Sequence, residues 1–342
     1  MMKKKILFVG GTKGGGVGML NSEVIRIFDE AGYRYDLVDP AALKERFPKI
    51  IAHLIAYITT KIKIITFWPD TVYVQLAQTR YIHQTVHLLI AKLFGRETIG
   101  HLHANADLEN IISRAELGRI IFSQHYIDKM IVLTEPCRKS LADNGWNKDL
   151  FVVPNFINTE DLPAEIKPVT ERSQLLYLGR MSREKGIFDV LEMADRLPDE
   201  HFVFVGNFED AQTEEEFNRR LVTSSNAEYL GPMYNKEKYR VIAESKLLLL
   251  PTRRDEFPMI LIEASMLGCV PLVTLTGSVG EIIKDGYNGF YISPDDIDGI
   301  IGKIRRLEDG EVLERMSKNG IEYAREHFTS RNAERKLFEI VG

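Results

Sequence analysis

The sequence contains only two cysteines, Cys137 and Cys269, which lie far apart. Two isolated cysteines build no disulfide framework, and a reducing compartment, the cytoplasm, is the simplest expectation. No stretch approaches the roughly 18 consecutive apolar residues of a membrane-spanning helix. The basic start Lys3-Lys4-Lys5 is followed by a short apolar run, Ile6 to Val9, and then by two glycines. This run is too short for a signal peptide and indicates a first β-strand.

The composition indicates a soluble globular protein with two domains. A chain of 342 residues is too long for one ordinary core, and 44% hydrophobic with 27% charged residues is typical of globular proteins. Residues 1–150 hold 20 Lys+Arg against 15 Asp+Glu, a balance of +5, and residues 151–342 hold 24 against 34, a balance of −10. A lipid-phosphate surface would suit the basic half, although ordinary scatter of charge explains it equally well. No nucleic-acid partner is expected.

Short apolar runs alternate with amphipathic segments along the chain, which predicts parallel strands joined by helices. Residues 154–172 carry three prolines without a clear period and are the best linker candidate. We predict two doubly wound α/β domains, 1–158 and 159–327, and a helix at about 328–342 that packs back on the first. The expected strands are Lys5–Val9, Tyr35–Val38, Thr71–Leu76, Thr98–His103, Met130–Leu133, Phe151–Val153, Leu175–Leu178, Phe202–Val205, Lys246–Leu250, Val270–Thr274 and Phe290–Ile292.

A glycine-rich loop, residues 10–20, follows the first expected strand. Glycines let backbone approach a phosphate closely, and the amides of the following helix would point at it. The loop lacks the Gly-Lys-Ser/Thr ending of a Walker A motif and the third glycine of the dinucleotide fingerprint. This loop is therefore either a tight turn or a phosphate-binding site.

Two motifs of the second half carry the chemistry. Arg180 and Lys185 lie five positions apart, between Gly179 and Gly186 and directly after an expected strand. Ligands bind beyond the carboxyl ends of strands in such sheets, so the two cations are placed to hold a diphosphate, with a solvated loop as the alternative.

The second motif, Asp255 to Glu263, flanks a helix that begins near Pro258. The loop from Asp255 to Phe257 would offer backbone amides to sugar hydroxyls or phosphate, and Glu263 could accept hydrogen bonds from a ribose diol. The alternative makes Asp255 a helix cap and Glu263 a surface charge. An unpaired carboxylate in this apolar helix would be costly, so a buried polar partner of Glu263 is predicted.

His101 and His103 alternate on one expected strand and therefore share a face. They are either hydrogen-bonded core residues or members of a binding site. No metal site is expected here.

The motifs together resemble the retaining glycosyltransferases of family four, and the similarity covers most of the chain from about residue 95. It implies a GT-B fold, in which two Rossmann-like domains with doubly wound parallel sheets face each other across a cleft. The segments that carry it are Val132-Leu133-Thr134, Val153-Pro154-Asn155, Gly179 to Gly186, Asp255 to Glu263, Gly268-Cys269-Val270-Pro271, Gly277 to Ile283 and Asp285 to Phe290.

The resemblance also implies a donor site for a nucleoside-diphosphate sugar. Asp255 stands where the family usually has a glutamate, and it is one methylene shorter. The implied residues are Arg180 and Lys185 with the amides of Gly15 and Gly16 for the diphosphate, Glu263 for the ribose, Met233 for the base, and Asp255, Phe257 and His103 for the sugar, with His101 as second choice for His103. In the family's usual mechanism the leaving diphosphate takes the acceptor's proton, and neither a metal nor a cofactor is required.

The segment from Arg46 to Trp68 mixes apolar residues with lysines and aromatics. This pattern resembles an interfacial helix at a membrane, and a buried helix followed by a strand is equally consistent with it.

We therefore expect a metal-independent, retaining glycosyltransferase that uses a nucleoside-diphosphate sugar, with UDP favoured. The expected acceptor is a growing or lipid-linked bacterial surface glycan, such as lipopolysaccharide, at the cytoplasmic face of the inner membrane. A nucleotide-sugar 2-epimerase of the same fold and a non-catalytic nucleotide-sugar-binding protein are the alternatives.

Overall fold

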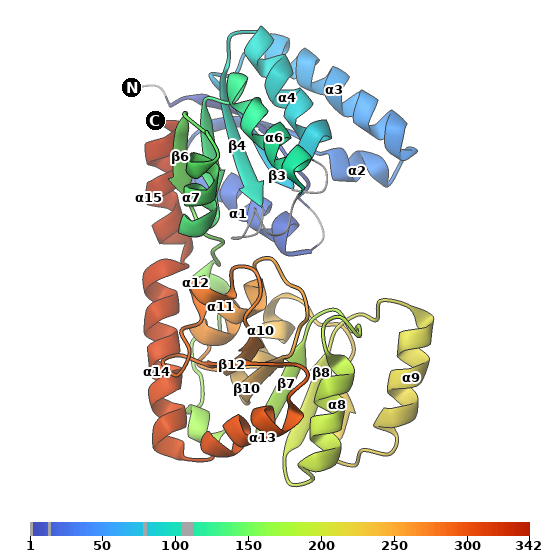
Figure 1. Ribbon diagram of the computed structural model, residues 1–342. Coiled ribbons are helices and arrows are strands. Elements are labelled where there is room, and N and C mark those ends of the chain that lie inside the picture. Colours follow the sequence, from blue (N-terminus) through green and yellow to red (C-terminus); the bar gives the residue numbers. More distant parts are fainter. Residues whose placement is uncertain (1–2, 13–14, 78–80, 104–112) are drawn as a thin grey trace. The chain divides into compact units, whose positions relative to one another are not determined.

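The computed structural model describes every residue except 1–2, 13–14, 78–80 and 104–112. The chain forms two compact units: unit 1 comprises Met1–Ile157 with Ser330–Gly342, and unit 2 comprises Asn158–Thr329 (Figure 1). The sequence analysis predicts the border after residue 158, one residue later than in the structure. The predicted linker is largely part of unit 2, because Arg172 at its end is buried and donates hydrogen bonds to the carbonyl oxygens of Ser245 and Leu267 at 3.1 and 2.9 Å.

Unit 1 contains a parallel sheet of six strands in the order β2-β1-β3-β4-β5-β6. Its inner strands are buried on both faces, which is why they form nearly continuous apolar runs in the sequence. The strands are β1 (Lys5–Val9), β2 (Arg34–Val38), β3 (Thr71–Ala77), β4 (Glu97–His103), β5 (Lys129–Val132) and β6 (Asp149–Val152). The helices are α1 (Gly15–Glu30), α2 (Pro40–Lys44), α3 (Lys49–Thr66), α4 (Tyr81–Leu93), α6 (Arg114–Phe122) and α7 (Glu135–Asp143).

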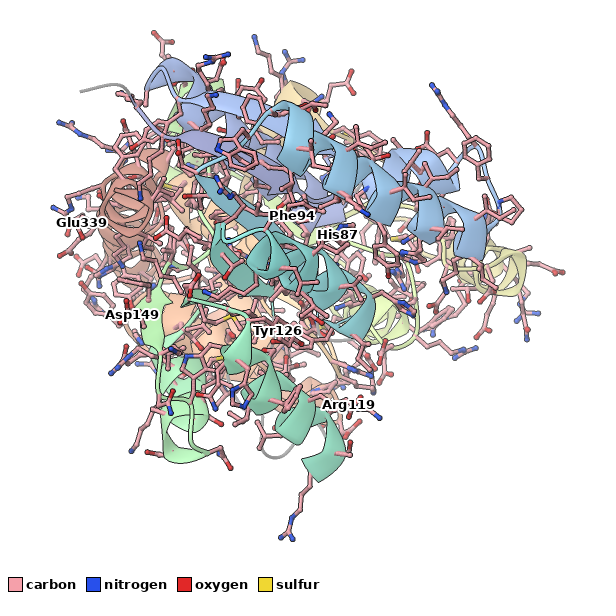
Figure 2. The ribbon with its side chains drawn as sticks, turned by 90° about the horizontal axis from the view of Figure 1, so that it is seen from above. His87, Phe94, Arg119, Tyr126, Asp149 and Glu339 are labelled. Carbon is pink, nitrogen blue, oxygen red and sulfur yellow. The ribbon has the colours of Figure 1, made fainter. Side chains whose placement is uncertain are left out.

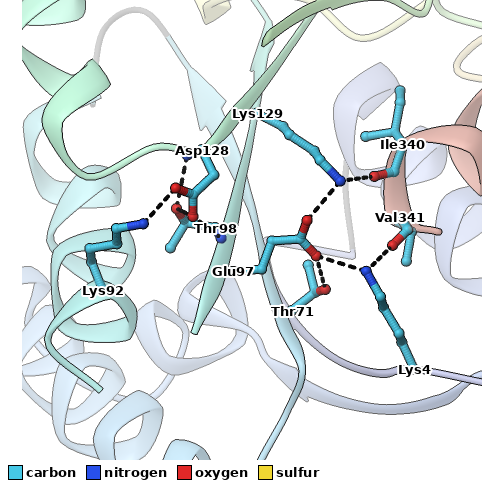
Figure 3. Close-up of polar contacts among 9 residues, drawn as sticks. All are labelled: Lys4, Thr71, Lys92, Glu97, Thr98, Asp128, Lys129, Ile340 and Val341. Atoms are coloured by element: carbon cyan, nitrogen blue, oxygen red, sulfur yellow. Dashed lines mark hydrogen bonds and ion pairs between the residues drawn. The ribbon is translucent and has the colours of Figure 1, made fainter. Parts of the chain in front are cut away.

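The C-terminal helix α15 (Ser330–Val341) belongs to unit 1. Its buried Leu337 and Ile340 join a core cluster with residues of β1 and α1. Two lysines at the beginnings of β1 and β5 bind the last turn of α15. Lys4 Nζ donates to the Val341 carbonyl and Lys129 Nζ to the Ile340 carbonyl, each at 2.6 Å (Figure 3). Glu97 holds both lysines, at 3.1 and 2.7 Å. Cations at a helix C-terminus are favourable, so these contacts fix the chain end.

In the segment from Arg46 to Trp68, Lys49–Thr66 form one long helix, α3, and the segment contains no strand after it. Small residues of α3, namely Ala52, Ala56 and Thr60, are buried. Thr60 Oγ1 lies 2.7 Å from Nδ1 of His87 on α4. His87 is labelled in Figure 2, which shows the protein from above. In the part of the chain that the structure describes, no helix combines the length and apolar character needed to cross a membrane.

Unit 2 contains a second parallel sheet, in the order β12-β11-β10-β7-β8-β9. The sequence predicts all of these strands except β9, a three-residue edge strand, Ala-Glu-Tyr, without an apolar run. The strands are β7 (Gln174–Leu178), β8 (His201–Val205), β9 (Ala227–Tyr229), β10 (Ser245–Leu250), β11 (Val270–Thr274) and β12 (Phe290–Ile292). The helices are α8 (Ile187–Arg196), α9 (Ala211–Leu221), α10 (Asn235–Glu244), α11 (Met259–Met266), α12 (Val279–Ile282), α13 (Ile297–Arg306) and α14 (Gly310–His327).

The two strand orders fix where each sheet can bind a ligand. If β7 to β12 are counted from one to six, the order of unit 2 is 3-2-1-4-5-6, the Rossmann arrangement. The order reverses between β7 and β10, and in sheets of this kind ligands bind beyond the carboxyl ends of the strands at such a reversal. In unit 1 the reversal lies between β1 and β3. The sequence prediction of doubly wound parallel sheets is confirmed for both units.

Candidate active site

The two sequence motifs of unit 2 lie at its topological switch point. β7 ends at Leu178, directly before the loop that carries Arg180 and Lys185, and β10 ends at Leu250, shortly before Asp255. Neighbouring parallel strands end at the same edge of a sheet, and β7 pairs with β10. The loops that carry Lys185 and Asp255, which are 70 positions apart in the sequence, therefore lie side by side.

Backbone contacts hold the two loops together. The Arg253 amide donates to the Glu184 carbonyl at 2.8 Å. Gly186 has a φ of +81°, and a Cβ at this position would lie 2.4 Å from the Pro251 carbonyl oxygen. Only glycine fits this close approach at positive φ. The glycine after Lys185 is thus explained by loop packing.

Lys185 and Asp255 form an ion pair. Lys185 Nζ lies 2.7 Å from Asp255 Oδ2 and 2.7 Å from the Arg254 carbonyl oxygen. About four-fifths of each side chain is buried, with exposed fractions of 22% and 21%. The structure therefore joins two predicted site residues, and it commits the Asp255 carboxylate to a lysine.

Arg180 is the exposed cation of this site. Its side chain is 64% exposed, and its guanidinium makes one long contact, 3.4 Å to Glu209 Oε1. Its backbone is fixed, because the Tyr177 hydroxyl donates to the Arg180 carbonyl at 2.6 Å. A guanidinium on an anchored backbone, with most of its surface in water, is accessible to an anionic ligand.

Glu263 has the buried partner that the sequence predicts, and this partner is Lys238 on α10. Lys238 Nζ lies 2.6 Å from Glu263 Oε1, and only 4% of the Glu263 side chain is exposed. Burial raises the pKa of the Glu263 carboxyl, and the charge and hydrogen bond of Lys238 oppose this effect. The sequence analysis predicts a buried partner but does not identify it as Lys238. The apolar neighbours Tyr239, Val241 and Ile242 do indicate that Lys238 is buried.

The remaining predicted residues of unit 2 lie in loops. Phe257 is buried, and its ring packs edge-on against Phe328 at 6.5 Å between centroids. Met233 is half-buried between β9 and α10. The Glu256 carbonyl accepts a hydrogen bond from the Ser278 amide at 2.9 Å, which ties the acidic loop to the loop after β11. Burial raises the pKa of the Glu256 carboxyl.

Unit 1 has a cavity of about 270 Å³ at the carboxyl ends of β1 and β3. Three of its lining side chains are buried and carry a polar atom without a partner among the described residues: Asn21 Oδ1, Gln75 Nε2 and His103 Nδ1. Buried polar atoms without partners are costly and mark places where a ligand can bind. Asn21 and Gln75 were missed from the sequence, although Gln75 interrupts an otherwise apolar strand.

His103 is the predicted site residue at this cavity, and His101 lies beside it with their rings 4.5 Å apart. His103 Nε2 is hydrogen-bonded to Gln75 Oε1. The amide oxygen can only accept, so Nε2 carries the proton and Nδ1 is left as an acceptor. His101 Nδ1 instead lies 2.8 Å from the Tyr73 hydroxyl.

The glycine-rich loop is described in part. Gly15 and Gly16 lie in the first turn of α1, where backbone amides have no partners within the helix. Lys13 and Gly14 lie outside the described residues, as do residues 104–107 after His103. The strand end around Gly10 is closely packed, because a Cβ there would meet Gln75 Cγ at 2.8 Å.

We expect unit 1 to lose stability as the pH falls from about 6.5 to about 4. Burial lowers the pKa of both His87 and His103 to about 4, and His53 adds a repulsive contribution for His87. The unfolded imidazoles titrate near 6.5. Between these values the unfolded chain binds protons that the folded unit does not. The free energy of unfolding should therefore fall by about 1.4 kcal/mol per pH unit for each histidine.

Both tryptophans, Trp68 and Trp146, lie in unit 1, so urea unfolding followed by tryptophan fluorescence at pH 7 and pH 5 measures this effect. Replacement of both His87 and His103 by Gln should make the pH dependence clearly shallower, and the part that remains is that of His101, whose pKa burial lowers well below the usual value. Replacement of the exposed His125 by Gln should leave it unchanged. An equally steep loss in the double variant would contradict the assignment.

Comparison with known proteins agrees with this geometry. Residues 158–327 match the family described as "Glycosyl transferases group 1". A glycogen synthase of Mycobacterium tuberculosis is 26% identical over 191 residues, 53% of this chain and 44% of that protein. The UDP-Gal:alpha-D-GlcNAc-diphosphoundecaprenol alpha-1,3-galactosyltransferase of Escherichia coli is 27% identical over 213 residues, 57% of this chain and 52% of that protein. The chain thus spans about half the length of these relatives.

Solved structures show the same fold over the whole chain. A crystal structure of Anabaena Alr3699/HepE in complex with UDP and glucose has a TM-score of 0.76 at 15% identity and covers 99% of both chains. A glycosyltransferase from Rickettsia africae has a TM-score of 0.81 at 15% identity and covers 100% of this chain and 98% of that one. The chain has the GT-B fold, and through residues 158–327 it belongs to the group 1 glycosyltransferases.

Proposed function

We propose that this protein is a metal-independent, retaining glycosyltransferase that moves a sugar from a nucleoside-diphosphate sugar, UDP favoured, to a hydroxyl of a growing or lipid-linked glycan. The observation that carries the proposal is the contact of Lys185 with Asp255 at the switch point of a Rossmann-ordered sheet, with the exposed Arg180 in the same loop as Lys185. This edge is where such sheets bind nucleotides, and the two cations suit a diphosphate.

In this proposal unit 2 holds the donor. Arg180 has an accessible fork of donors, and Lys185 is a point charge that Asp255 already orients. The Glu263 carboxylate, held through Oε1 by Lys238, would accept hydrogen bonds from the ribose diol through its other oxygen. When the bond to the sugar breaks, negative charge grows on the diphosphate. Cations that are already in place stabilise this charge without further reorganisation.

Unit 1 would bind the sugar hydroxyls and the acceptor. His103 is neutral at pH 7, because burial lowers its pKa to about 4. Its Nδ1, which has no partner among the described residues, can accept a hydrogen bond from a hydroxyl, while Gln75 Nε2 in the same cavity can donate one. With Asn21 Oδ1 as a second acceptor, the cavity offers both acceptors and a donor, which a sugar hydroxyl requires.

The names of the similar proteins support the choice of donor and acceptor. HepE was crystallised with UDP and with UDP-glucose. The galactosyltransferase of Escherichia coli is named for a UDP-sugar and for an acceptor linked to diphosphoundecaprenol. We therefore propose a UDP-sugar donor and a lipid-linked acceptor for this chain as well.

A transfer assay tests the proposal. The protein is incubated with labelled UDP-, GDP- and ADP-sugars, with either a soluble glycan or a polyprenyl-diphosphate-linked sugar, and with or without EDTA. We expect label to move from a UDP-sugar into an acceptor with the anomeric configuration retained, at a rate that EDTA does not change. Epimerisation of the donor without transfer would support the 2-epimerase. Tight nucleotide-sugar binding without turnover would support a non-catalytic protein.

We expect His103→Ala to lower the rate of transfer about ten- to hundredfold while nucleotide affinity stays within about twofold. The substitution leaves a buried sugar hydroxyl without its partner, which costs about 1–3 kcal/mol. The nucleotide affinity is unaffected in this proposal because unit 2 holds the nucleotide. Calorimetric titration with UDP and steady-state transfer rates measure the two effects. The exposed His125→Ala is the control, and wild-type turnover in His103→Ala would remove this residue from the site.

A further inference from the structure

Helix α3 of unit 1 exposes a row of large aliphatic side chains. Their exposed fractions lie between 48% and 84%, and they recur every three to four residues on one side of the helix. Fifteen residues separate the first from the last, a length of about 22 Å. We call this row the α3 apolar face, and it consists of Ile50, Ile51, Leu54, Ile58, Ile62 and Ile65.

The opposite side of α3 is firmly packed. Ala52, Ala56 and Ile64 are fully buried, and Tyr57 donates a hydrogen bond to the His83 carbonyl of α4 at 3.0 Å. The small residues let α3 lie close to its neighbours. Apart from Ile64, the helix is therefore fixed by its small residues while its large aliphatic residues face outward, the reverse of an ordinary surface helix.

Other large apolar side chains are exposed on the elements next to α3. Leu89 and Leu93 of the adjacent α4 are 44% and 78% exposed. Phe47 before the helix and Trp68 after it are 41% and 53% exposed, and the Arg96 guanidinium lies 4.1 Å from the centre of the Trp68 ring. Large exposed apolar patches mark interaction surfaces. Aromatic rings at both ends are typical of segments that lie at a membrane–water interface.

The charged residues of the segment that forms the face are of one sign. Residues 46–68 contain four cations, Arg46, Lys49, Lys61 and Lys63, and no Asp or Glu. Lys63 is paired with Asp36 at 2.5 Å, whereas Arg46, Lys49 and Lys61 are exposed. Two copies joined through this face would bring these cations together, which is unfavourable. An anionic surface would instead be attracted to them.

We propose that the α3 apolar face docks unit 1 on an anionic lipid bilayer, with α3 lying flat in the interface and its cations at the level of the lipid phosphates. The apolar side chains enter the boundary between headgroups and acyl chains, as in other interfacial helices. His53 of the same helix lines the unit 1 cavity, so docking would bring this cavity to the membrane surface. Binding of α3 to lipid requires neither donor nor acceptor and is independent of sugar transfer.

Sedimentation of the full chain with extruded vesicles tests the proposal. We expect binding to vesicles of 70% phosphatidylcholine and 30% phosphatidylglycerol, much weaker binding to pure phosphatidylcholine, and weakening by salt. Leu54→Ser/Ile58→Ser/Ile62→Ser should lower the partition coefficient more than about tenfold, because binding scales with buried apolar area. Lys49→Gln/Lys61→Gln should lower it about fivefold for each lysine, and only on anionic vesicles.

A matched control removes exposed apolar residues elsewhere. Val222→Ser/Leu275→Ser changes side chains of unit 2 that are 87% and 56% exposed, and it should bind like the wild type. Melting temperatures verify that all variants fold. If the triple variant does not fold, the variant with the two lysine substitutions still tests the proposal. Absence of binding to anionic vesicles would overturn the proposal. A dimer that the triple variant dissociates, without vesicle binding, would assign the face to a second copy and overturn it as well.

Discussion

Lys185→Met is expected to lower the rate of sugar transfer about 100- to 1000-fold, a loss of about 2.7–4 kcal/mol in transition-state stabilisation. Lys185 is held at 2.7 Å by Asp255 and by the Arg254 carbonyl, so its charge is already in place when a diphosphate leaves. Methionine preserves much of the aliphatic stem and removes the charge. The substitution also leaves the Asp255 carboxylate without its cation, and this carboxylate would repel the leaving group. Single-turnover transfer rates at saturating donor measure the effect.

Two matched variants separate this role from general changes in charge. Arg183 lies in the same loop, is 64% exposed and pairs with Glu216, so Arg183→Met should change the rate by only a few-fold. Asp255→Asn releases Lys185 from its ion pair, so the affinity for UDP should stay the same or increase. A wild-type transfer rate in Lys185→Met would contradict the assignment of the diphosphate site.

The strands could be predicted from the sequence because inner strands of parallel sheets are buried on both faces. Runs such as Leu175–Leu178 and Lys246–Leu250 have no other simple interpretation. The edge strand β9 was missed because its residues are half exposed and need not be apolar. In the segment from Arg46 to Trp68 the alternation of apolar and basic residues is compatible with several structures, and only packing decides that it is one helix with an apolar face turned outward.

The candidate site could be predicted in its residues but not in its contacts. Arg180, Lys185 and Asp255 follow strand ends, which the sequence shows. The contact between Lys185 and Asp255 depends on β7 pairing with β10, and the order of strands along the chain does not determine their order in the sheet. The cost of burying a charge predicts a partner for Glu263. Its identity as Lys238 requires the packing of α10 on α11.

Glu263→Ala is expected to destabilise unit 2 by about 3–5 kcal/mol, because it leaves the Lys238 ammonium buried without its carboxylate. Both tryptophans lie in unit 1, so tryptophan fluorescence does not report on unit 2. Hydrogen exchange of the α11 and β11 amides measures this loss directly. Exposed Glu314→Ala on α14 is the control, since its ion pair with Lys318 is more than half exposed on both sides and contributes little.

A double variant separates the structural role of Glu263 from its proposed contact with ribose. Lys238→Met/Glu263→Leu removes both charges and fills the space with apolar atoms, so most of the stability should return. The affinity for UDP should not return, because the carboxylate that would bind the ribose diol is missing, and the expected loss is about 1–3 kcal/mol. If the stable double variant binds UDP like the wild type in calorimetric titrations, Glu263 only supports the fold, and the ribose must be bound elsewhere.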